Sequence, residues 1–388
     1  MEFALDDTQQ SVRDLAIEVL TREQERAGGE PDHETGSRAI WKAMAAAGLL
    51  SVAVPERFGG GGLGPLATGV LLTEVGRRAA EVPALATLAF GVLPIARHGT
   101  EQQQERLLRD VDAGRVLTAA LNEPSHALPD RPRTTARQDG DALVVTGTKT
   151  DVLCAEEAAE ILVPVSLDDG GTAIALVRPD AAGLERRSCA LSGGRAATLR
   201  FTEVRGERLG GGGVGDGGAL ADLHRCALAG MCALGDGAVR GALELTTEHV
   251  RTRTQFGRPL AAFQAVAGQI ADVYVTARTL HLAALSACWR LGEGREPSEH
   301  RELHEGPELH EGREPSAHWD PDEDLAVAAL WLAEEAPAAM HTCHHLHGGI
   351  GVDATYPMHR HYSLVKDLAR LLGGASGRMD ALAGRIAG

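Results

Sequence analysis

The chain has 388 residues, of which 44% are hydrophobic but only 3% aromatic, and its formal net charge is −16. The surplus of 54 acidic over 38 basic residues argues against a general nucleic-acid-binding protein, although a local arginine cluster could still hold a small anionic ligand. The length predicts two or three domains. With so few aromatic residues, the core must consist mostly of alanine, leucine and valine, which favours helices packed through small side chains.

Targeting signals and disulfides are not expected either. The opening residues, MEFALDDTQQ, are acidic and lack the basic start and apolar run of a signal peptide. No stretch offers the roughly 18 uncharged apolar residues that a membrane span needs. The six cysteines include no CxxC pair, which in a chain of this length indicates free thiols. We therefore expect a soluble protein in the reducing cytoplasm.

Helical periodicity dominates the first third of the chain. Asp7 and Gln10 are predicted to form a capping box, and Thr100 with Gln103 opens a second helix that stops at Gly114. Between these helices, VPERFGGGGLG must be a loop, because four consecutive glycines cannot hold a helix. The buried face of the first helix is expected to contain Val12, Leu15, Ala16, Val19 and Leu20.

Strand patterns begin near Arg115. DALVVTGT, AEILVPVS, GTAIALVRP and ATLRFTEV are short runs rich in valine, isoleucine, leucine and threonine, separated by glycine, proline and aspartate. In the last run, Leu199, Phe201 and Val204 alternate roughly with polar residues. This pattern predicts an antiparallel sheet or barrel with one face in water.

Helices are expected again from Leu220, where thirty-five residues contain no proline and many alanines, and from about Phe263 to Leu291. The segment EGREPSEH at 293–300 then recurs as EGREPSAH at 311–318. These repeats are polar and lack apolar periodicity, so we predict a disordered insert at 293–320, a loop expansion rather than a metal-binding tract. Helices resume at Asp322.

The order of helices, strands and helices favours separate domains over a doubly wound sheet. We predict an N-terminal helical domain at 1–114, a middle β domain at 115–213 and a C-terminal helical domain at 214–388 that contains the insert.

A histidine- and glycine-rich stretch, HHLHGGIGVDATYPMHR, follows the last of these helices. His341 with His344 or His345 has the spacing of metal ligands on one helix face, and Cys343 and His347 are close in sequence. The glycines equally suit a phosphate-binding loop or part of a larger cofactor pocket. The spacing alone does not choose among these interpretations.

Four motifs together resemble the acyl-CoA dehydrogenases: GLLSVAVPERFGGGGLG, TGTK, RTRTQFGRPLAAFQAVAGQIADV and HLHGGIGVDATYPMHR, in that order. The resemblance covers nearly all of the chain outside 293–320. It implies an α+β multidomain fold with an N-terminal helical domain, a middle antiparallel β-barrel and a C-terminal four-helix bundle. It also implies a tetramer that binds FAD, introduces a double bond between Cα and Cβ of an acyl-CoA thioester, and passes electrons to an acceptor similar to electron-transfer flavoprotein.

The residues that would bind the FAD phosphates match the family. Arg253 stands where the family has an arginine that reaches FAD phosphates, in many members across a subunit interface, and its guanidinium suits bidentate phosphate binding. Gln255 and Phe256 match neighbouring cofactor contacts. Without the other motifs, Arg253 would be interpreted as a helix-end residue that caps carbonyl groups.

The histidine-rich stretch matches the family's Q-x-x-G-G loop. Gly348 and Gly349 let the backbone approach a cofactor closely and offer it N–H groups. His345 stands where glutamine is usual, and an imidazole can still donate a hydrogen bond to a phosphate or adenine. This match explains the glycines better than a metal site does, so no metal is predicted.

The residues expected to contact the flavin ring differ from the family. Asn122 replaces the threonine of a T-E-P segment that keeps Glu123 and Pro124, and the Gly-Ser-Asp turn that normally follows is missing. Asp151 stands where an aromatic residue usually packs near the ring. A carboxylate is a poor neighbour for a flavin that gains negative charge. If the alignment is shifted by two residues, Asp151 is instead a surface residue at a strand end.

The family's catalytic glutamate is absent. Gly373 occupies its usual position, and His224 lies near the place, early in the first C-terminal helix, where a minority of members carry it. Histidine can act as a general base. His224 can equally be an ordinary polar helix residue.

The sequence therefore predicts a half-site. The groups that serve a neighbour's FAD are kept, whereas those for the chain's own ring pocket and proton abstraction are altered. The sequence of the histidine-rich stretch resembles a branch of actinobacterial type. Members of that branch form heterotetramers that act on bulky acyl-CoAs, and one of their subunit types carries the base. We hypothesise that this chain is the partner subunit. The alternatives are a homotetramer that uses His224 or an unrecognised carboxylate, and a structural subunit without flavin.

Overall fold

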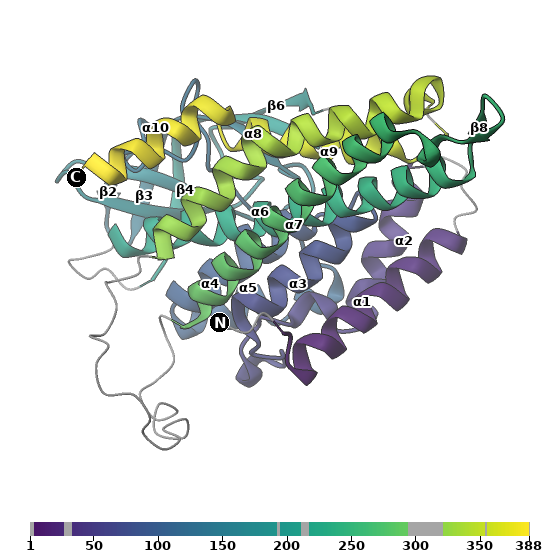
Figure 1. Cartoon of the computed structure of the whole chain (residues 1–388). Helices are drawn as coiled ribbons and strands as arrows, with labels where there is room; N and C mark the ends of the chain where they lie inside the picture. The colour runs from purple at the N-terminus through teal and green to yellow at the C-terminus, as the bar shows by residue number, and fades with distance from the viewer. Residues whose placement is uncertain are drawn as a thin grey trace, which may run out of the picture.

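The computed structural model describes residues 4–26, 33–191, 195–210, 217–293, 321–353 and 355–387. The predicted insert at 293–320 lies outside these residues apart from Glu293. Figure 1 shows N-terminal helices, a sheet at one end of the molecule and long C-terminal helices, which is the predicted order.

The N-terminal third is helical. It contains α1 (Asp7–Arg26), α2 (His33–Ala46), α3 (Gly64–Arg77), the π-helix η3 (Leu85–Val92), α4 (Leu93–His98) and α5 (Glu101–Leu108), with the short 3-10 turns η1 (Leu49–Ser51), η2 (Glu56–Phe58) and η4 (Val111–Ala113). The loop predicted around the four glycines is present, with η2 inside it.

One of the two predicted capping boxes is confirmed. The side chain of Thr100 accepts from the amide of Gln103, whose side chain in turn accepts from the amide of Thr100. At α1 the prediction was one residue late, because the reciprocal bonds join Asp6 and Gln9 at 2.7 and 3.1 Å. The sequence D-D-T-Q-Q offers both registers with the same chemistry, so it could not distinguish them.

Two further helix details differ from the prediction. Leu15 is 38% exposed, whereas the other four residues predicted for the core face of α1 are buried. The helix that begins after Thr100 ends at Leu108, and η4 with Gly114 at φ 87° completes the segment. Only the last turn before Gly114 was therefore misassigned as helix.

The middle region forms one seven-stranded sheet. Its strands are β1 (Leu117–Ala119), β2 (Thr135–Asp139), β3 (Ala142–Leu153), β4 (Glu160–Leu167), β5 (Thr172–Val177), β6 (Leu184–Ala190) and β7 (Arg195–Arg208). The four predicted runs correspond to β3, β4, β5 and β7. β1, β2 and β6 were missed because β1 has three residues and the other two are rich in polar residues.

The sheet is mainly antiparallel, as predicted, but both β1 and β2 pair with β4 in parallel. All other pairings in this sheet are antiparallel. Leu199, Phe201 and Val204 are buried, as their alternation predicted.

The C-terminal region is a helical bundle. It contains α6 (Gly217–Thr252), the hairpin β8 (Thr254–Gln255) and β9 (Arg258–Pro259), the turn η5 (Leu260–Ala262), α7 (Gln264–Glu293), α8 (Pro321–His347), the 3-10 helix η7 (Gly348–Val352), α9 (Met358–Leu371) and α10 (Gly374–Ala387). Helices α6, α7, α8 and α9 pack together as the predicted four-helix bundle, and α10 is a fifth helix lying on α8.

Helix α6 forms the centre of the molecule. It packs against α3, α7, α8 and α9. Among the described helices only α6 is long and apolar enough to cross a membrane, and 83% of its most apolar window is buried inside the protein. Core packing therefore accounts for its apolar composition.

Candidate functional site

The first part of the predicted site lies on a projecting hairpin. Strands β8 and β9 are joined by Phe256 and Gly257, both with positive φ (53° and 78°), as a tight hairpin turn requires. Phe256 is 90% exposed, and its ring meets Phe263 edge-on with the centroids 6.2 Å apart. The guanidinium of Arg258 lies 4.0 Å from the centroid of Phe263. The tip is thus internally braced while its largest apolar side chain faces outward.

Arg253 lies at the base of this hairpin, directly after α6. Its backbone is fixed, because its amide donates to the carbonyl of His249 and its carbonyl accepts from the amide of Leu260, both at 2.9 Å. Its exposed guanidinium makes no hydrogen bond or ion pair within the described part of the chain. Gln255, on β8, is also exposed. The backbone of Arg253 is therefore held in place, while its guanidinium makes no hydrogen bond to a helix-end carbonyl group in the described ranges.

The end of α6 meets the end of α8 through two stacked histidines. The rings of His249 and His347 are 4.6 Å apart. Both nitrogens of His347 are occupied, one by the carbonyl of Cys343 at 2.8 Å and the other by the hydroxyl of Tyr356 at 3.0 Å. Burial lowers the pKa of both His249 and His347. This contact brings the base of the hairpin close to the glycine loop that begins at residue 348.

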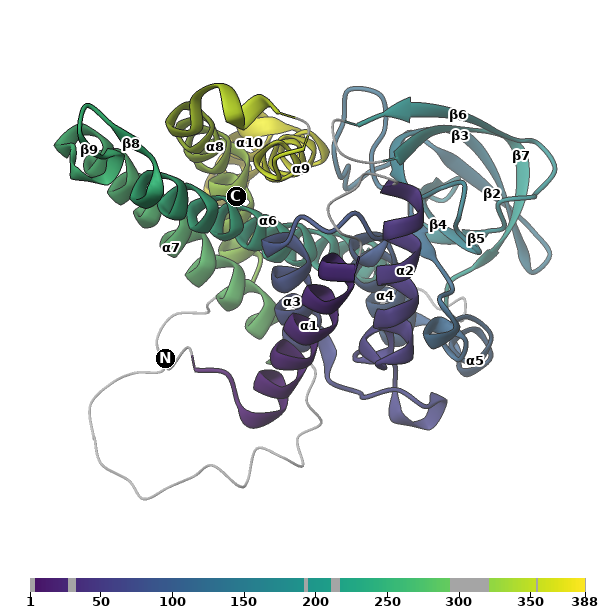
Figure 2. The same cartoon turned by 90° about the vertical axis from the view of Figure 1, so that its right-hand side faces the viewer.

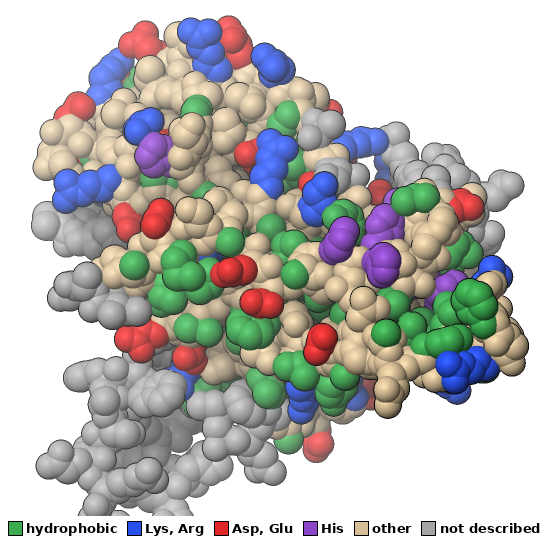
Figure 3. All heavy atoms as spheres, turned by 45° about the horizontal axis from the view of Figure 1, so that its top comes forward, with side chains coloured by type: hydrophobic (Ala, Val, Ile, Leu, Met, Phe, Trp, Pro, Cys, Tyr) green, Lys and Arg blue, Asp and Glu red, His purple; other side chains and the backbone are tan. Residues whose placement is uncertain are grey.

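The glycine loop is open to its surroundings. Gly348, at φ 58°, and Gly349 are exposed, and a Cβ added to either would meet nothing within 4 Å. His345 is exposed beside them, and Figure 3 shows histidines gathered on the surface of the molecule. His344 is engaged with the carbonyl of Gly351 at 2.8 Å. In the described ranges, no three His, Cys, Asp or Glu side chains are grouped to hold a metal ion.

Asn122 lies between β1 and β2, and its side chain is partly engaged by hydrogen bonds inside the chain. It is 6% exposed, its side-chain amide donates to the carbonyl of Leu371 at 2.9 Å, and its side-chain oxygen accepts from the amide of Leu128 at 3.1 Å. Asn122 therefore joins the β domain to the end of α9. It has one amide hydrogen and one lone pair left for any ligand.

Gly373 and Asp151 are also committed to local structure. Gly373 has φ 82°, and a Cβ there would lie 2.8 Å from the Cβ of Ala127. Asp151, at φ 54°, accepts from Arg370 at 2.6 Å, which ties β3 to α9. Asp151 is therefore not a free surface residue, because Arg370 pairs with it.

A buried ion pair supports the loop that replaces the Gly-Ser-Asp turn. Lys149 donates to Glu123 at 2.8 Å, with side-chain exposures of 0% and 1%. Glu123 also accepts from the amides of Arg133 and Thr134 at 2.7 and 2.9 Å. Burial alone would raise the pKa of Glu123, but these donors outweigh it and lower that pKa to about 2. Burial lowers the pKa of Lys149 to about 8, against the opposing effect of Glu123.

His224 lies beneath the same loop. It is 7% exposed, its Nδ1 is 3.8 Å from the carboxylate of Asp130, and its Nε2 has no hydrogen-bond partner. Burial lowers the pKa of His224, Asp130 opposes this, and Lys149 adds to it. Nε2 of the imidazole could accept a proton, but the ring is enclosed by its own chain.

The residues predicted to bind the phosphates and those predicted to surround the ring lie far apart within this chain. Figure 2 shows the β8–β9 hairpin and the sheet at opposite ends of the molecule, as Figure 1 does from its own side. The hairpin that carries Gln255 and Phe256 therefore lies apart from the β domain that carries Asp151.

Comparison with known proteins identifies the family to which this architecture belongs. Residues 6–115 match the family described as acyl-CoA dehydrogenase, N-terminal domain, and residues 219–386 match acyl-CoA dehydrogenase, C-terminal domain. Acyl-CoA dehydrogenase FadE28 of Mycobacterium tuberculosis is 41% identical over 99% of both chains. The chain belongs to the acyl-CoA dehydrogenase family. Acyl-CoA dehydrogenase FadE27 of the same organism is 33% identical over 90% of this chain and 88% of its own.

Solved acyl-CoA dehydrogenase structures agree with the fold. The Tcur3481-Tcur3483 steroid ACAD, in a variant form, superposes with a TM-score of 0.82 at 34% identity over 98% of both chains. The ChsE4-ChsE5 complex from Mycobacterium tuberculosis gives 0.84 at 28% identity, covering 100% of this chain and 99% of that one. The resemblance inferred from four motifs is therefore confirmed, as is the predicted fold class.

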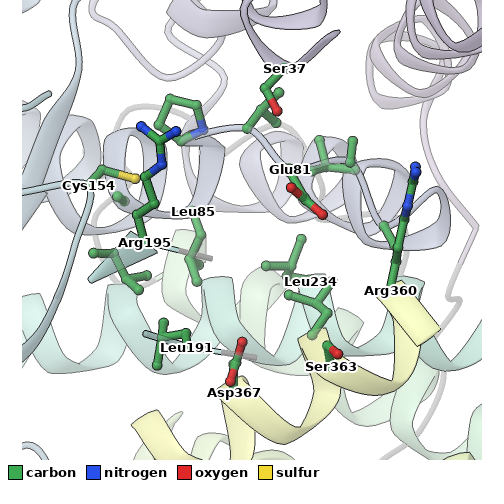
Figure 4. A pocket seen from close by; sticks show the side chains of 18 of the residues that line it. Ser37, Glu81, Leu85, Cys154, Leu191, Arg195, Leu234, Arg360, Ser363 and Asp367 are labelled. Atoms are coloured by element: carbon green, nitrogen blue, oxygen red, sulfur yellow. The ribbon is translucent and has the colours of Figure 1, made fainter. Parts of the chain in front are cut away.

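The acyl-CoA dehydrogenase fold here encloses a cavity of about 550 Å³ that sequence reasoning missed. Its lining comes from α2, the α3–η3 connection, the β domain, α6 and α9, so no local motif could have indicated it. Figure 4 shows Arg195 and Arg360 on opposite sides, with Leu85 and Leu234 between them. Leu371, whose carbonyl bonds Asn122, also lines it. An apolar interior with charged edges suits an amphipathic molecule.

Carboxylates in this cavity bear on the question of the missing base. Glu81, Glu157 and Asp367 line it, whereas Gly373 and His224 do not. Glu81 and Asp367 already have partners in the structure, and Glu157 lies 3.5 Å from the guanidinium of Arg195. All three carboxylates that line this cavity are therefore already engaged within the chain.

The fit of FAD to this chain differs between its two ends. The exposed charge of Arg253 and the open backbone at Gly348 and Gly349 suit phosphate groups. At the ring end, Asn122 and Asp151 already bond within the chain, and Ala127 occupies the space beside Gly373. The phosphate end therefore offers unengaged groups, whereas the side chains at the ring end are already engaged within the chain.

Proposed function

We propose that this chain is one subunit of a heteromeric, FAD-dependent acyl-CoA dehydrogenase that acts in lipid metabolism. In this proposal Arg253, Gln255 and Phe256, with His345, Gly348 and Gly349, bind the phosphate end of a flavin held mainly by a homologous subunit. FAD, when bound, supplies the acceptor for a hydride from the β carbon of an acyl-CoA thioester. The partner subunit supplies the base, because Gly373 has no side chain to do so.

The observation that carries this proposal is the contrast between the two ends. Arg253 has no ion-pair partner in the described ranges, and Phe256 exposes 90% of its surface. An exposed aromatic residue at a hairpin tip is what a second chain would cover. Asn122, by contrast, is buried and bonded to Leu128 and Leu371. The groups that could bind FAD phosphates are therefore better suited to a flavin held by a neighbouring subunit than to a flavin held by this chain.

The remaining assignments follow from the same proposal. The assembly is a tetramer, its electron acceptor is similar to electron-transfer flavoprotein, and the acyl group occupies the cavity between Leu85 and Leu234. All six cysteines are free thiols, which supports a reducing, cytoplasmic location.

The test compares the chain alone with the chain co-expressed with a homologue that carries the glutamate. We expect little bound FAD in the lone chain, and both bound FAD and acyl-CoA-driven ferrocenium reduction in the complex. Arg253→Ala should release most FAD from the complex, because phosphate binding loses a charge-assisted contact worth about 1.5–3 kcal/mol. Arg251→Ala is the matched control, since it removes an exposed arginine two residues away that already pairs with Glu248.

Full flavin occupancy and turnover by the lone chain would contradict the proposal and favour a homotetramer. A second candidate, a structural subunit without flavin, is favoured by the closed ring end. In that case no FAD in the complex would be bound through Arg253, and Arg253→Ala would leave the FAD content of the complex unchanged.

A further inference from the structure

A second cavity, of about 370 Å³, lies between α1, α3, α6 and α7. It shares no lining residue with the 550 Å³ cavity. Its lining combines apolar side chains, among them Leu66, Val70 and Leu285, with polar and charged ones. Nothing in the proposed dehydrogenation uses these residues, so their arrangement needs a separate explanation.

Two buried carboxylates line this cavity with hydrogen-bonding capacity unused. Asp236 is 1% exposed, and its Oδ2 accepts from Nδ1 of His281 at 2.9 Å and from the hydroxyl of Thr73 at 3.5 Å, but its Oδ1 has no hydrogen-bond partner. Glu74 is 2% exposed, and its Oε2 makes no hydrogen bond, the nearest charge being Arg77 at 3.6 Å. In the described part of the chain, these are two of only three buried carboxylate oxygens without a hydrogen bond. Buried acceptors of this kind are rare in folded proteins and require donors.

Positively charged groups line the same cavity. Arg240 is only loosely paired, with its guanidinium 3.9 Å from Asp236, and Arg13 lies 3.5 Å from Asp14 with its Nε unbonded. His281 keeps Nε2 for another partner, because Asp236 occupies Nδ1. The cavity thus combines acceptors that lack donors with donors that are loosely engaged.

We propose that this cavity binds a small zwitterion with a short apolar side chain, the chemistry of an aliphatic α-amino acid. Its ammonium group donates to Asp236 and Glu74, and its carboxylate accepts from Arg13 and Arg240. The side chain lies against the apolar side chains of the lining. An amine alone would leave the arginines unmatched, and a carboxylate alone would face two buried carboxylates. A metal ion lacks a set of three ligands in the described ranges.

The test titrates the full-length chain with three molecules of similar shape: L-valine, isobutylamine and isobutyrate. Binding is measured by calorimetry and by the shift in melting temperature. We expect L-valine to bind at least about tenfold more tightly than either single-charge analogue, because only it satisfies both sets of groups. Equal affinities, or no saturable binding because the cavity holds ordered water only, would overturn the proposal.

Two isosteric variants locate the binding site. Glu74→Gln and Asp236→Asn should each weaken L-valine binding by about tenfold or more. Asp112→Asn is the control, because Asp112 also has an unpartnered carboxylate oxygen but does not line this cavity. If Asp236→Asn fails to fold, Glu74→Gln and the ligand series still decide. Unchanged affinity in Glu74→Gln would contradict the assignment, and none of these results depends on whether the chain binds FAD.

Discussion

Replacing Glu123 with glutamine should destabilise the protein strongly, because it leaves Lys149 buried without a counter-charge. The folded state lowers the pKa of Glu123 from 4.5 to about 2. At about 1.4 kcal/mol for each pKa unit, the ionised carboxylate is favoured by about 3 kcal/mol in the folded protein relative to the unfolded one. This agrees with the roughly 3–5 kcal/mol usually lost when one partner of a buried ion pair is removed. We therefore expect Glu123→Gln to lower the free energy of unfolding by about 3 kcal/mol.

The assay is urea unfolding at neutral pH, followed by circular dichroism. Glu105→Gln is the control, because it breaks an exposed pair with Arg109 at 3.0 Å and should cost at most about 0.5 kcal/mol. Combining Glu123→Gln with Lys149→Met should restore part of the loss, because the unpaired charge is then gone. A cost below about 1 kcal/mol for Glu123→Gln, or a double variant no more stable than the single one, would refute this reasoning.

The pH dependence gives the same prediction an independent test. Since the folded-state pKa of Glu123 lies below its unfolded value, its contribution is complete above pH 4.5 and is lost as the pH falls toward 2. The wild type should therefore lose more stability over that interval than Glu123→Gln does. Parallel stability curves for the two proteins would contradict the assignment.

Three further substitutions separate structure from catalysis. Asn122→Ala should lower the free energy of unfolding by about 1–3 kcal/mol, because it leaves the carbonyl of Leu371 and the amide of Leu128 unpaired. The FAD content of the complex should not change. A loss of flavin at unchanged stability would contradict this. Gly373→Glu should lower the melting temperature and give the lone chain no turnover, because a Cβ at φ 82° would press against Ala127; measurable dehydrogenation would refute this. His224→Gln should leave turnover of the complex unchanged, whereas a loss of about 100-fold or more would identify His224 as the base.

Much of the fold followed from sequence because local patterns and global packing agree. A proline-free, alanine-rich run predicted α6, and α7 was expected from about Phe263. The valine- and isoleucine-rich runs predicted β3, β4, β5 and β7. Glycines and capping residues bounded most of these elements. The strands that escaped detection are stabilised by their neighbours: β1 and β2 each pair with β4, and the polar β6 pairs with β7.

The candidate site was less predictable because its groups act through residues distant in sequence. Nothing near Asn122 indicates that its amide reaches Leu371, 249 positions away. Likewise, nothing near Asp151 in the sequence indicates that its carboxylate pairs with Arg370. The large cavity was missed for the same reason, since five segments form it. Motif matching indicates which residues could bind a cofactor, but not whether the fold already uses them.

The residues of the hairpin and those of the ring end differ in how much they contribute to the stability of their own chain. Phe256 adopts φ 53° and exposes its ring, which lowers the free energy of unfolding by about 1 kcal/mol. Within the chain its ring makes only an edge-on contact with Phe263. Asn122 and Glu123, in contrast, stabilise the fold that contains them. Substitutions at the hairpin should therefore change cofactor retention at constant stability, and substitutions at the ring end should do the reverse. A chain that held a complete site of its own would show both effects at both ends.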